Sequence, residues 1–105
     1  MSGTEQLYVV ARTRIDVDED NEYDIQYFRF RARKPAMRFI DRELKDELKF
    51  ATSYKRAFGG RMSSSVQLSL SCKEGFGSII VDGHETRYVI MKKCKNGEMK
   101  RDIEQ

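Results

Sequence analysis

Histidine and cysteine, which are common at metal sites and in nucleophilic catalysis, are scarce in this chain. Its 105 residues include one histidine, two cysteines and no tryptophan. Cys72 and Cys94 form no C-x-x-C pair, and His84 has no nucleophile placed beside it by the sequence. We therefore expect no catalytic residues, no metal site, no cofactor and no enzymatic activity. The thiols are predicted to be reduced and half-buried, with a disulfide between Cys72 and Cys94 left open in case their strands pair.

Long apolar runs are also missing. No stretch approaches the roughly 20 apolar residues that cross a bilayer. The first residues, Met-Ser-Gly-Thr-Glu, show no basic segment followed by an apolar one, as an export signal would. We therefore expect a cytoplasmic protein without a membrane partner, built as a single domain over residues 1–105.

The acidic run and the glycines match no motif for a cation or a phosphate. An EF-hand loop starting at Asp16 needs glycine at its sixth position and glutamate at its twelfth, where this chain has Asn21 and Tyr27. A phosphate loop needs Gly-Lys-Ser/Thr between a strand and a helix, and the sequence contains no such triplet. The run from Asp16 to Asn21 is instead predicted to be a solvated hairpin tip.

Alternating polar and apolar residues predict a long N-terminal hairpin, with strands at residues 5–15 and 22–33. A helix is predicted to follow Pro35, over residues 36–58, and to end at Gly59-Gly60. Its apolar stripe recurs at steps of three and four as far as Ala51, as one face of a helix requires, and a seven-residue gap precedes its last member. The stripe consists of Met37, Ile40, Leu44, Leu48, Ala51 and Phe58.

Period-two patterns return in the second half of the chain, at residues 66–72, 76–81 and 84–93. Asp82-Gly83 is a strong signal for a two-residue hairpin, which would place Val81 opposite His84. Asn96-Gly97 predicts a second tight turn before a short strand at residues 99–103. The predicted fold class is α+β: one long amphipathic helix on one face of an antiparallel sheet of five or six strands, in the order ββαβββ(β).

The segment from Tyr27 to Lys34 is the best candidate for a binding site. Arginine guanidinium groups pair with phosphates, and aromatic rings stack on unpaired bases. If the outward faces of the first two strands coincide, one patch collects aromatic and basic side chains from both. The candidate residues are Tyr8, Arg12, Arg14, Tyr27, Arg29, Arg31 and Arg33.

Two functions fit this patch. The first is non-catalytic binding of RNA or single-stranded nucleic acid through a basic and aromatic sheet face. The alternative is a small protein-interaction module, an inhibitor or adaptor, which would dock through the open sheet face, an edge strand or the acidic hairpin tip. An acidic protein surface would be its partner, because complementary charge steers association. The net charge of +3 is too small to decide between the two, and the sequence leaves the oligomeric state open.

Overall fold

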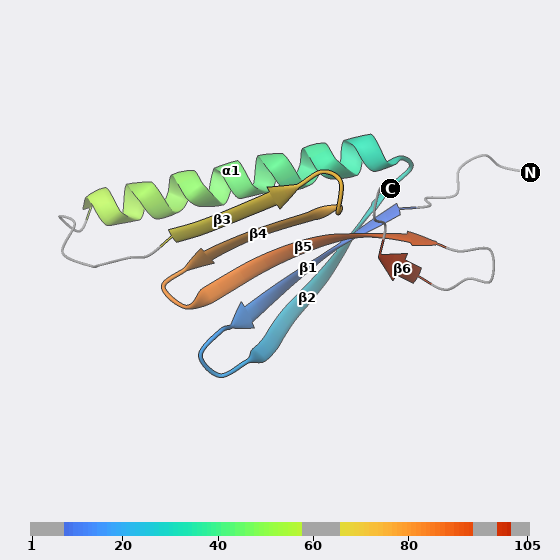
Figure 1. The fold of residues 1–105 in the computed structure, drawn as a ribbon. Coiled ribbons are helices and arrows are strands. Elements are labelled where there is room, and N and C mark those ends of the chain that lie inside the picture. Colours follow the sequence, from blue (N-terminus) through green and yellow to red (C-terminus); the bar gives the residue numbers. More distant parts are fainter. Residues whose placement is uncertain (1–7, 58–65, 94–98, 102–105) are drawn as a thin grey trace, which may run out of the picture.

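A computed structural model describes residues 8–57, 66–93 and 99–101 (Figure 1). Within these residues, six strands and one helix follow one another: β1 (Tyr8–Asp16), β2 (Asn21–Phe30), α1 (Arg33–Ala57), β3 (Val66–Ser71), β4 (Phe76–Val81), β5 (His84–Lys93) and β6 (Met99–Arg101). The predictions at Phe58, Gly59-Gly60, Cys94 and Asn96-Gly97 fall outside the described residues. Within those residues, no helix is both long enough and apolar enough to cross a membrane.

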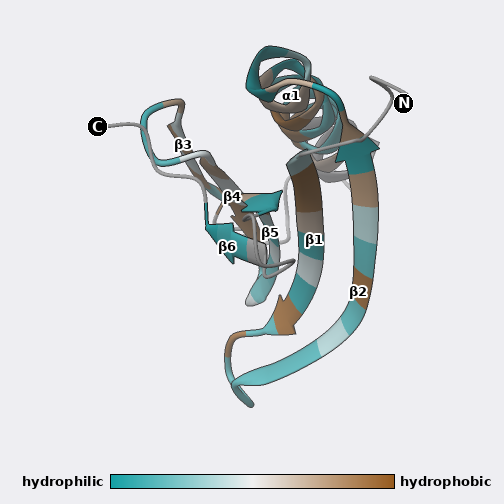
Figure 2. Ribbon diagram, turned by 90° about the vertical axis from the view of Figure 1, so that its right-hand side faces the viewer, coloured by the Kyte–Doolittle hydropathy of each residue, from teal (hydrophilic) through white to brown (hydrophobic). Residues whose placement is uncertain are grey.

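All strands form one antiparallel sheet in the order β2-β1-β5-β4-β3, with β6 beside the C-terminal part of β5. The helix α1 packs on one face of this sheet (Figure 2). The predicted α+β fold is thereby confirmed, and the bounds of β4 and β5 agree with the sequence pattern. The predicted pairing of Val81 with His84 at the Asp82-Gly83 turn is also confirmed.

The core lies between α1 and the sheet. From the predicted stripe, Met37, Ile40 and Leu44 are buried, with Ala36 beside them. On the sheet, the buried residues Val10, Ile79, Tyr88 and Ile90 face the helix. Phe39 lies off the stripe but joins the core, because its ring packs 4.7 Å from that of Phe28 and 5.3 Å from that of Phe30. Phe50, also off the stripe, is 74% exposed.

Gly77 on β4 lets the helix approach the sheet closely. A β-carbon at this position would lie 2.5 Å from Cγ2 of Ile40 and 2.7 Å from Cδ1 of Leu44. Real β-carbons are not found at such distances, so α1 rests on bare backbone here. Gly77 therefore fixes where α1 crosses β4.

The boundary between β2 and α1 differs from the prediction. β2 ends at Phe30 rather than at residue 33, and α1 begins at Arg33 rather than at residue 36. Pro35 still lies in the first helical turn, where its missing N–H costs nothing because the first N–H groups of a helix have no partner. The helix therefore extends through Arg33 and Lys34, and the strand is correspondingly shorter.

Charge is separated along the strands. The tips of the β1–β2 and β4–β5 hairpins form an acidic end, made of Asp16, Asp18, Glu19, Asp20, Glu22, Asp24 and Asp82. The opposite end of the sheet, the basic end, collects Arg29, Arg31, Arg33, Lys34, Lys73, Lys92, Lys93, Lys100 and Arg101. The nine residues of β1 separate the two ends by about 26 Å. Figure 1 shows the two hairpin tips on the left and the start of α1 and β6 on the right.

Candidate functional site

One row of side chains crosses the basic end of the open face, the sheet face turned away from α1. Arg29 on β2 is paired with Val9 on β1, Val9 with Met91 on β5, and Met91 with Arg101 on β6. Residues directly opposite in neighbouring strands point to the same side of a sheet. Two exposed arginines thus flank two aliphatic residues in one line, with about 14 Å between their α-carbons.

The next row of the open face carries two aromatic rings. Tyr27 on β2 pairs with Ala11, Ala11 with Val89, and Val89 with Phe76 on β4. The side chain of Tyr27 is 64% exposed. The guanidinium carbon of Arg101 lies 5.4 Å from the centre of the Phe76 ring. An arginine and an aromatic ring therefore lie on each side of the aliphatic floor. The aliphatic floor consists of Val9, Ala11, Val89 and Met91.

We call these two rows the arginine–aromatic floor; it consists of Val9, Ala11, Tyr27, Arg29, Phe76, Val89, Met91 and Arg101. Lys93 adds a further cation on the same face, two residues beyond Met91 on β5. No described helix or strand covers the open face. In Figure 2, which views the molecule from the basic end, β6, the end of β2 and the first turn of α1 are coloured as hydrophilic.

The structure divides the site predicted from sequence between two faces of the sheet. Tyr8 pairs with Phe30, and Arg12 pairs with Gln26, so both lie on the face that α1 covers. Arg14 follows on the same strand and face. Tyr27 and Arg29 lie on the open face. The expectation that the β1 and β2 candidates form one patch is therefore wrong, because β1 turns Arg12 and Arg14 toward the helix.

The sequence pattern predicted that Arg31 and Arg33 continue the outward row of β2. In the structure they do not. Arg31 lies at the bend after β2, and Arg33 is the first residue of α1. The Nη2 group of Arg33 donates a hydrogen bond to the carbonyl oxygen of Lys73, 3.1 Å away, and joins the helix to the β3–β4 turn. Both arginines belong to the basic end but not to the arginine–aromatic floor.

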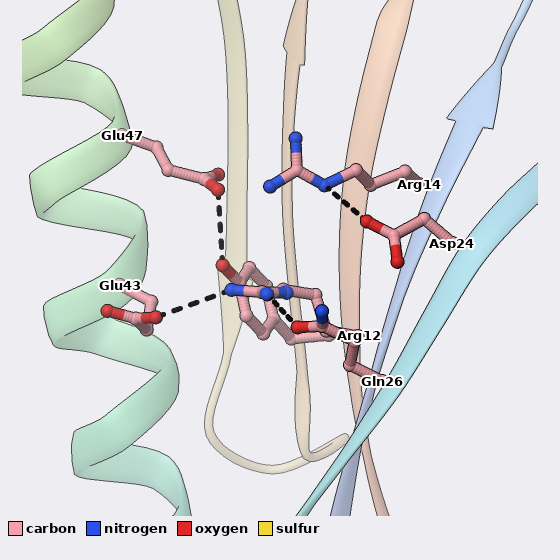
Figure 3. Close-up of polar contacts among 7 residues, drawn as sticks. Arg12, Arg14, Asp24, Gln26, Glu43 and Glu47 are labelled. Carbon is pink, nitrogen blue, oxygen red and sulfur yellow. Dashed lines mark hydrogen bonds and ion pairs between the residues drawn. The ribbon is translucent and has the colours of Figure 1, made fainter.

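Arg12 contacts one residue of α1 and two residues of β2; Figure 3 shows its contacts with Glu43 and Gln26. Its Nη1 atom lies 3.5 Å from Oε1 of Glu43, and its Nη2 group donates a hydrogen bond to Gln26. Its guanidinium carbon lies 5.1 Å from the centre of the Phe28 ring. Only 16% of the Arg12 side chain is exposed. These contacts assign Arg12 a structural role, joining the helix to the sheet.

Arg14 and Tyr88 lie near Arg12 on the sheet face that α1 covers. We call these three side chains, with their partners Asp24, Gln26, Glu43 and Glu47, the polar layer under the helix. Nε of Arg14 lies 3.4 Å from Oδ2 of Asp24. The hydroxyl of Tyr88 donates a 3.3 Å hydrogen bond to Oε1 of Glu47 on α1 (Figure 3). Burial raises the pKa of Glu47 above its ordinary value, against the opposing effect of Arg14. Burial and the nearby Glu47 carboxylate raise the pKa of Tyr88 to about 12. The layer joins the helix to the sheet, and within it the side chains of Arg14 and Asp24 remain 41% and 47% exposed.

A second polar cluster lies on the open face, toward the acidic end. The buried Glu85 accepts hydrogen bonds from Ser78 at 2.7 Å and from Nε of Arg87 at 2.9 Å. Burial alone would raise the pKa of Glu85, but the hydrogen bonds from Arg87 and Ser78 outweigh it and hold the pKa below its ordinary value. Because Arg87 is already paired with this carboxylate, we do not assign it to the binding surface.

Metal binding and thiol chemistry gain no support from the described side chains. Among them, no group of three or more His, Cys, Asp or Glu residues is placed to hold a metal ion. His84 is exposed at the start of β5. Cys72 is exposed in the β3–β4 turn, so the prediction of a half-buried thiol is wrong for this residue. A comparison with protein-family models, curated proteins and solved structures finds no match for the chain.

Sequence reasoning missed Phe76, Lys93 and Arg101. Their alternation within the later strands was visible in the sequence. The missing information was that β5 pairs with β1, which brings the later strands beside Arg29 and Tyr27. This pairing joins residues about 80 positions apart in the chain, as the partners Val9 and Met91 illustrate. No turn residue marks it.

Proposed function

We propose that this chain binds single-stranded nucleic acid, RNA or DNA, on the arginine–aromatic floor and without catalysis. The observation that carries the proposal is the pair of adjacent rows that place Arg29 and Tyr27 on one side of the aliphatic floor and Arg101 and Phe76 on the other. The four residues lie on neighbouring strands of one sheet, so the backbone sets the spacing between their α-carbons.

The chemistry of the floor suits a single strand. Guanidinium groups form paired hydrogen bonds with phosphate oxygens, and exposed rings stack on bases whatever their identity. In a duplex the bases are already stacked on each other, whereas an unpaired strand can offer both its bases and its phosphates to one surface. The other cations of the basic end extend this positive surface around the floor and favour the approach of a polyanion.

The aromatic rings favour nucleic acid over the alternative partner, an acidic protein. Carboxylates on a protein would engage Arg29, Lys93 and Arg101 equally well. They give no role to Tyr27, whose ring is 64% exposed beside Arg29. Stacking on a base would give that ring a partner.

The test measures binding of fluorescein-labelled oligouridine and oligodeoxythymidine by anisotropy. The double variant Arg29→Gln/Arg101→Gln removes two cations from the floor. For single strands each phosphate contact contributes about 0.7 to the slope of log K against log salt. We therefore expect the slope to flatten by about 1.4 and the affinity to fall roughly 25-fold at about 0.1 M salt.

The matched control is Arg42→Gln/Lys49→Gln, which removes the same charge from the exposed side of α1. It should bind within about twofold of the wild type, since long-range attraction is screened at this ionic strength. Equal losses in both double variants would show general charge attraction and refute the assignment of the floor. Wild-type protein that ignores both oligonucleotides but binds polyglutamate would refute nucleic-acid binding and support the protein-interaction alternative.

A further inference from the structure

The two edges of the sheet differ in how they are protected against pairing with another strand. Edge strands expose unpaired N–H and C=O groups, and proteins usually guard them with charged residues, proline or a bulge. β2 carries Glu22, Asp24 and Arg29, and its pairing with β1 is interrupted near Thr13 and Arg14, with Asp24 at a φ of 55°. This edge is guarded.

β3 has none of these features. Its sequence, Val-Gln-Leu-Ser-Leu-Ser, contains no charged residue and no proline, and it pairs with β4 without interruption from Val66 to Ser71. The side chains that β3 turns toward the α1 side are apolar and stay exposed: Val66 by 38%, Leu68 by 48% and Leu70 by 44%. We call this strand the neutral edge. Among the described residues, no strand pairs with the outer side of β3. Its backbone N–H and C=O groups on that side and its apolar row can therefore accept another strand.

A second copy of β3 complements this edge in its apolar row. Antiparallel pairing around a twofold axis at Leu68 places Leu68 opposite its own symmetry mate and Val66 opposite Leu70 of the other copy. Each apolar residue of the row then meets an apolar residue, while Gln67 meets Ser69 on the open face. A twofold contact of this kind is closed, so it ends at two chains.

Charge complementarity selects the antiparallel arrangement of two copies. β3 runs from the acidic end, where Val66 pairs with Val81, to the basic end, where Ser71 pairs with Phe76. Antiparallel pairing therefore brings the acidic end of one copy beside the basic end of the other. Asp82 of one copy would lie about two strand spacings, or ~10 Å, from the β3–β4 turn of the other. In that turn Glu74 offsets Lys73, and the guanidinium of Arg33, bound to the Lys73 carbonyl, leaves one net positive charge. The distance between Asp82 and this turn is close to the Debye length at about 0.1 M salt, so the attraction between the two ends is only partly screened.

We propose that two copies of this chain form a twofold dimer through antiparallel pairing of β3 with β3, centred on Leu68. The dimer joins the two sheets into one and places both helices on the same side of it. Both open faces then lie on the other side. The neutral edge shares no residue with the arginine–aromatic floor, so the dimer does not depend on the proposed function.

Sedimentation velocity on the full chain tests the dimer. The wild type should sediment as a dimer that dissociates on dilution. Leu68→Lys places like charges opposite each other at the axis and should raise the dissociation constant at least about tenfold. The matched control is Ile25→Lys on the guarded edge, since Ile25 is 47% exposed and Leu68 is 48% exposed; it should leave the dimer intact. Mixing Leu68→Lys with Leu68→Glu should restore a dimer, because the two charges meet at the axis.

Hydrogen exchange of the wild type gives a test that needs no variant to fold. Backbone amides of residues 66–71 should gain protection as the protein concentration rises, in step with the dimer fraction, whereas those of β2 should not. A monomer at all concentrations, assemblies larger than two chains, or a dimer indifferent to Leu68→Lys would overturn the proposal. So would a mixture of the two charged variants that stays monomeric, or concentration-dependent protection on β2 instead of β3.

Discussion

The substitution Gly77→Ala sets two opposing effects against each other. Glycine inside a strand costs stability relative to alanine, by roughly 0.5–1 kcal/mol, because it loses more freedom on folding. The backbone of Gly77 does not have a positive φ, unlike that of Gly75 and Gly83. Alanine therefore suits the local conformation, and local preference alone predicts that the variant is more stable.

Packing against α1 predicts the opposite sign and a larger effect. The added methyl carbon would lie 2.5 Å from Cγ2 of Ile40 and 2.7 Å from Cδ1 of Leu44. Carbon atoms in contact are normally 3.5–4.0 Å apart, so the methyl overlaps both side chains by about 1 Å. Both Ile40 and Leu44 are buried and cannot move into solvent. Overpacking of this kind costs about 1–3 kcal/mol, which corresponds to a fall in Tm of roughly 5–15 °C.

Urea unfolding followed by circular dichroism measures this change, and a double-mutant cycle identifies its cause. Leu44→Ala removes one of the two atoms that the methyl would strike and leaves a space beside Gly77. The double variant Gly77→Ala/Leu44→Ala should then be more stable than the sum of the single changes predicts, by about 0.5–3 kcal/mol. A Gly77→Ala protein as stable as the wild type, or additive changes in the cycle, would refute the close approach of α1 to β4.

Two further predictions concern the core and the polar layer under the helix. Leu44→Ala alone should lower the free energy of unfolding by about 2–5 kcal/mol, whereas an unchanged Tm would show that the stripe is not core. The pKa of Tyr88 is raised from 10.0 to about 12 in the folded state, so above pH 10 the unfolded chain loses this proton first and stability falls between pH 10 and 12. The difference amounts to about 2–3 kcal/mol, and Tyr88→Phe should lose less stability over that interval in alkaline unfolding; parallel curves would argue against a buried hydroxyl.

Local patterns in the sequence were sufficient to predict most elements of the fold. Asp82-Gly83 has a short-range cause, a two-residue turn, and the pairing of Val81 with His84 follows from it. The stripe at Met37, Ile40 and Leu44 follows from the period of a helix. Asp41 and Lys45, four residues apart on α1, form an ion pair with 2.9 Å between Nζ and Oδ2. All these features join residues that are near each other in the chain.

The face that each strand turns to the helix was not predictable in the same way. The sequence of β1 favours the other face for the core, because Val9, Ala11 and Ile15 make that face more apolar than the one that carries Val10 and two arginines. What turns Arg12 toward the helix is its partner Glu43 on α1, together with Gln26 and the ring of Phe28. Arginine on a covered face is stable only because these partners exist, and a strand pattern does not reveal them. A shift of one residue in register would exchange the two faces entirely.

The separation of charge along the strands connects the two proposed surfaces and keeps them independent. Each copy carries its arginine–aromatic floor at the basic end, and the antiparallel dimer places these ends at opposite limits of the joined sheet. The acidic end of one copy then flanks the basic end of the other. A single strand of nucleic acid that ran from one floor to the other would have to pass between acidic tips, which repel its phosphates. The dimer is therefore suited to one strand for each copy, bound without cooperation. Breaking the dimer at Leu68 should leave the affinity of each floor unchanged, whereas removing Arg29 and Arg101 should leave the dimer intact.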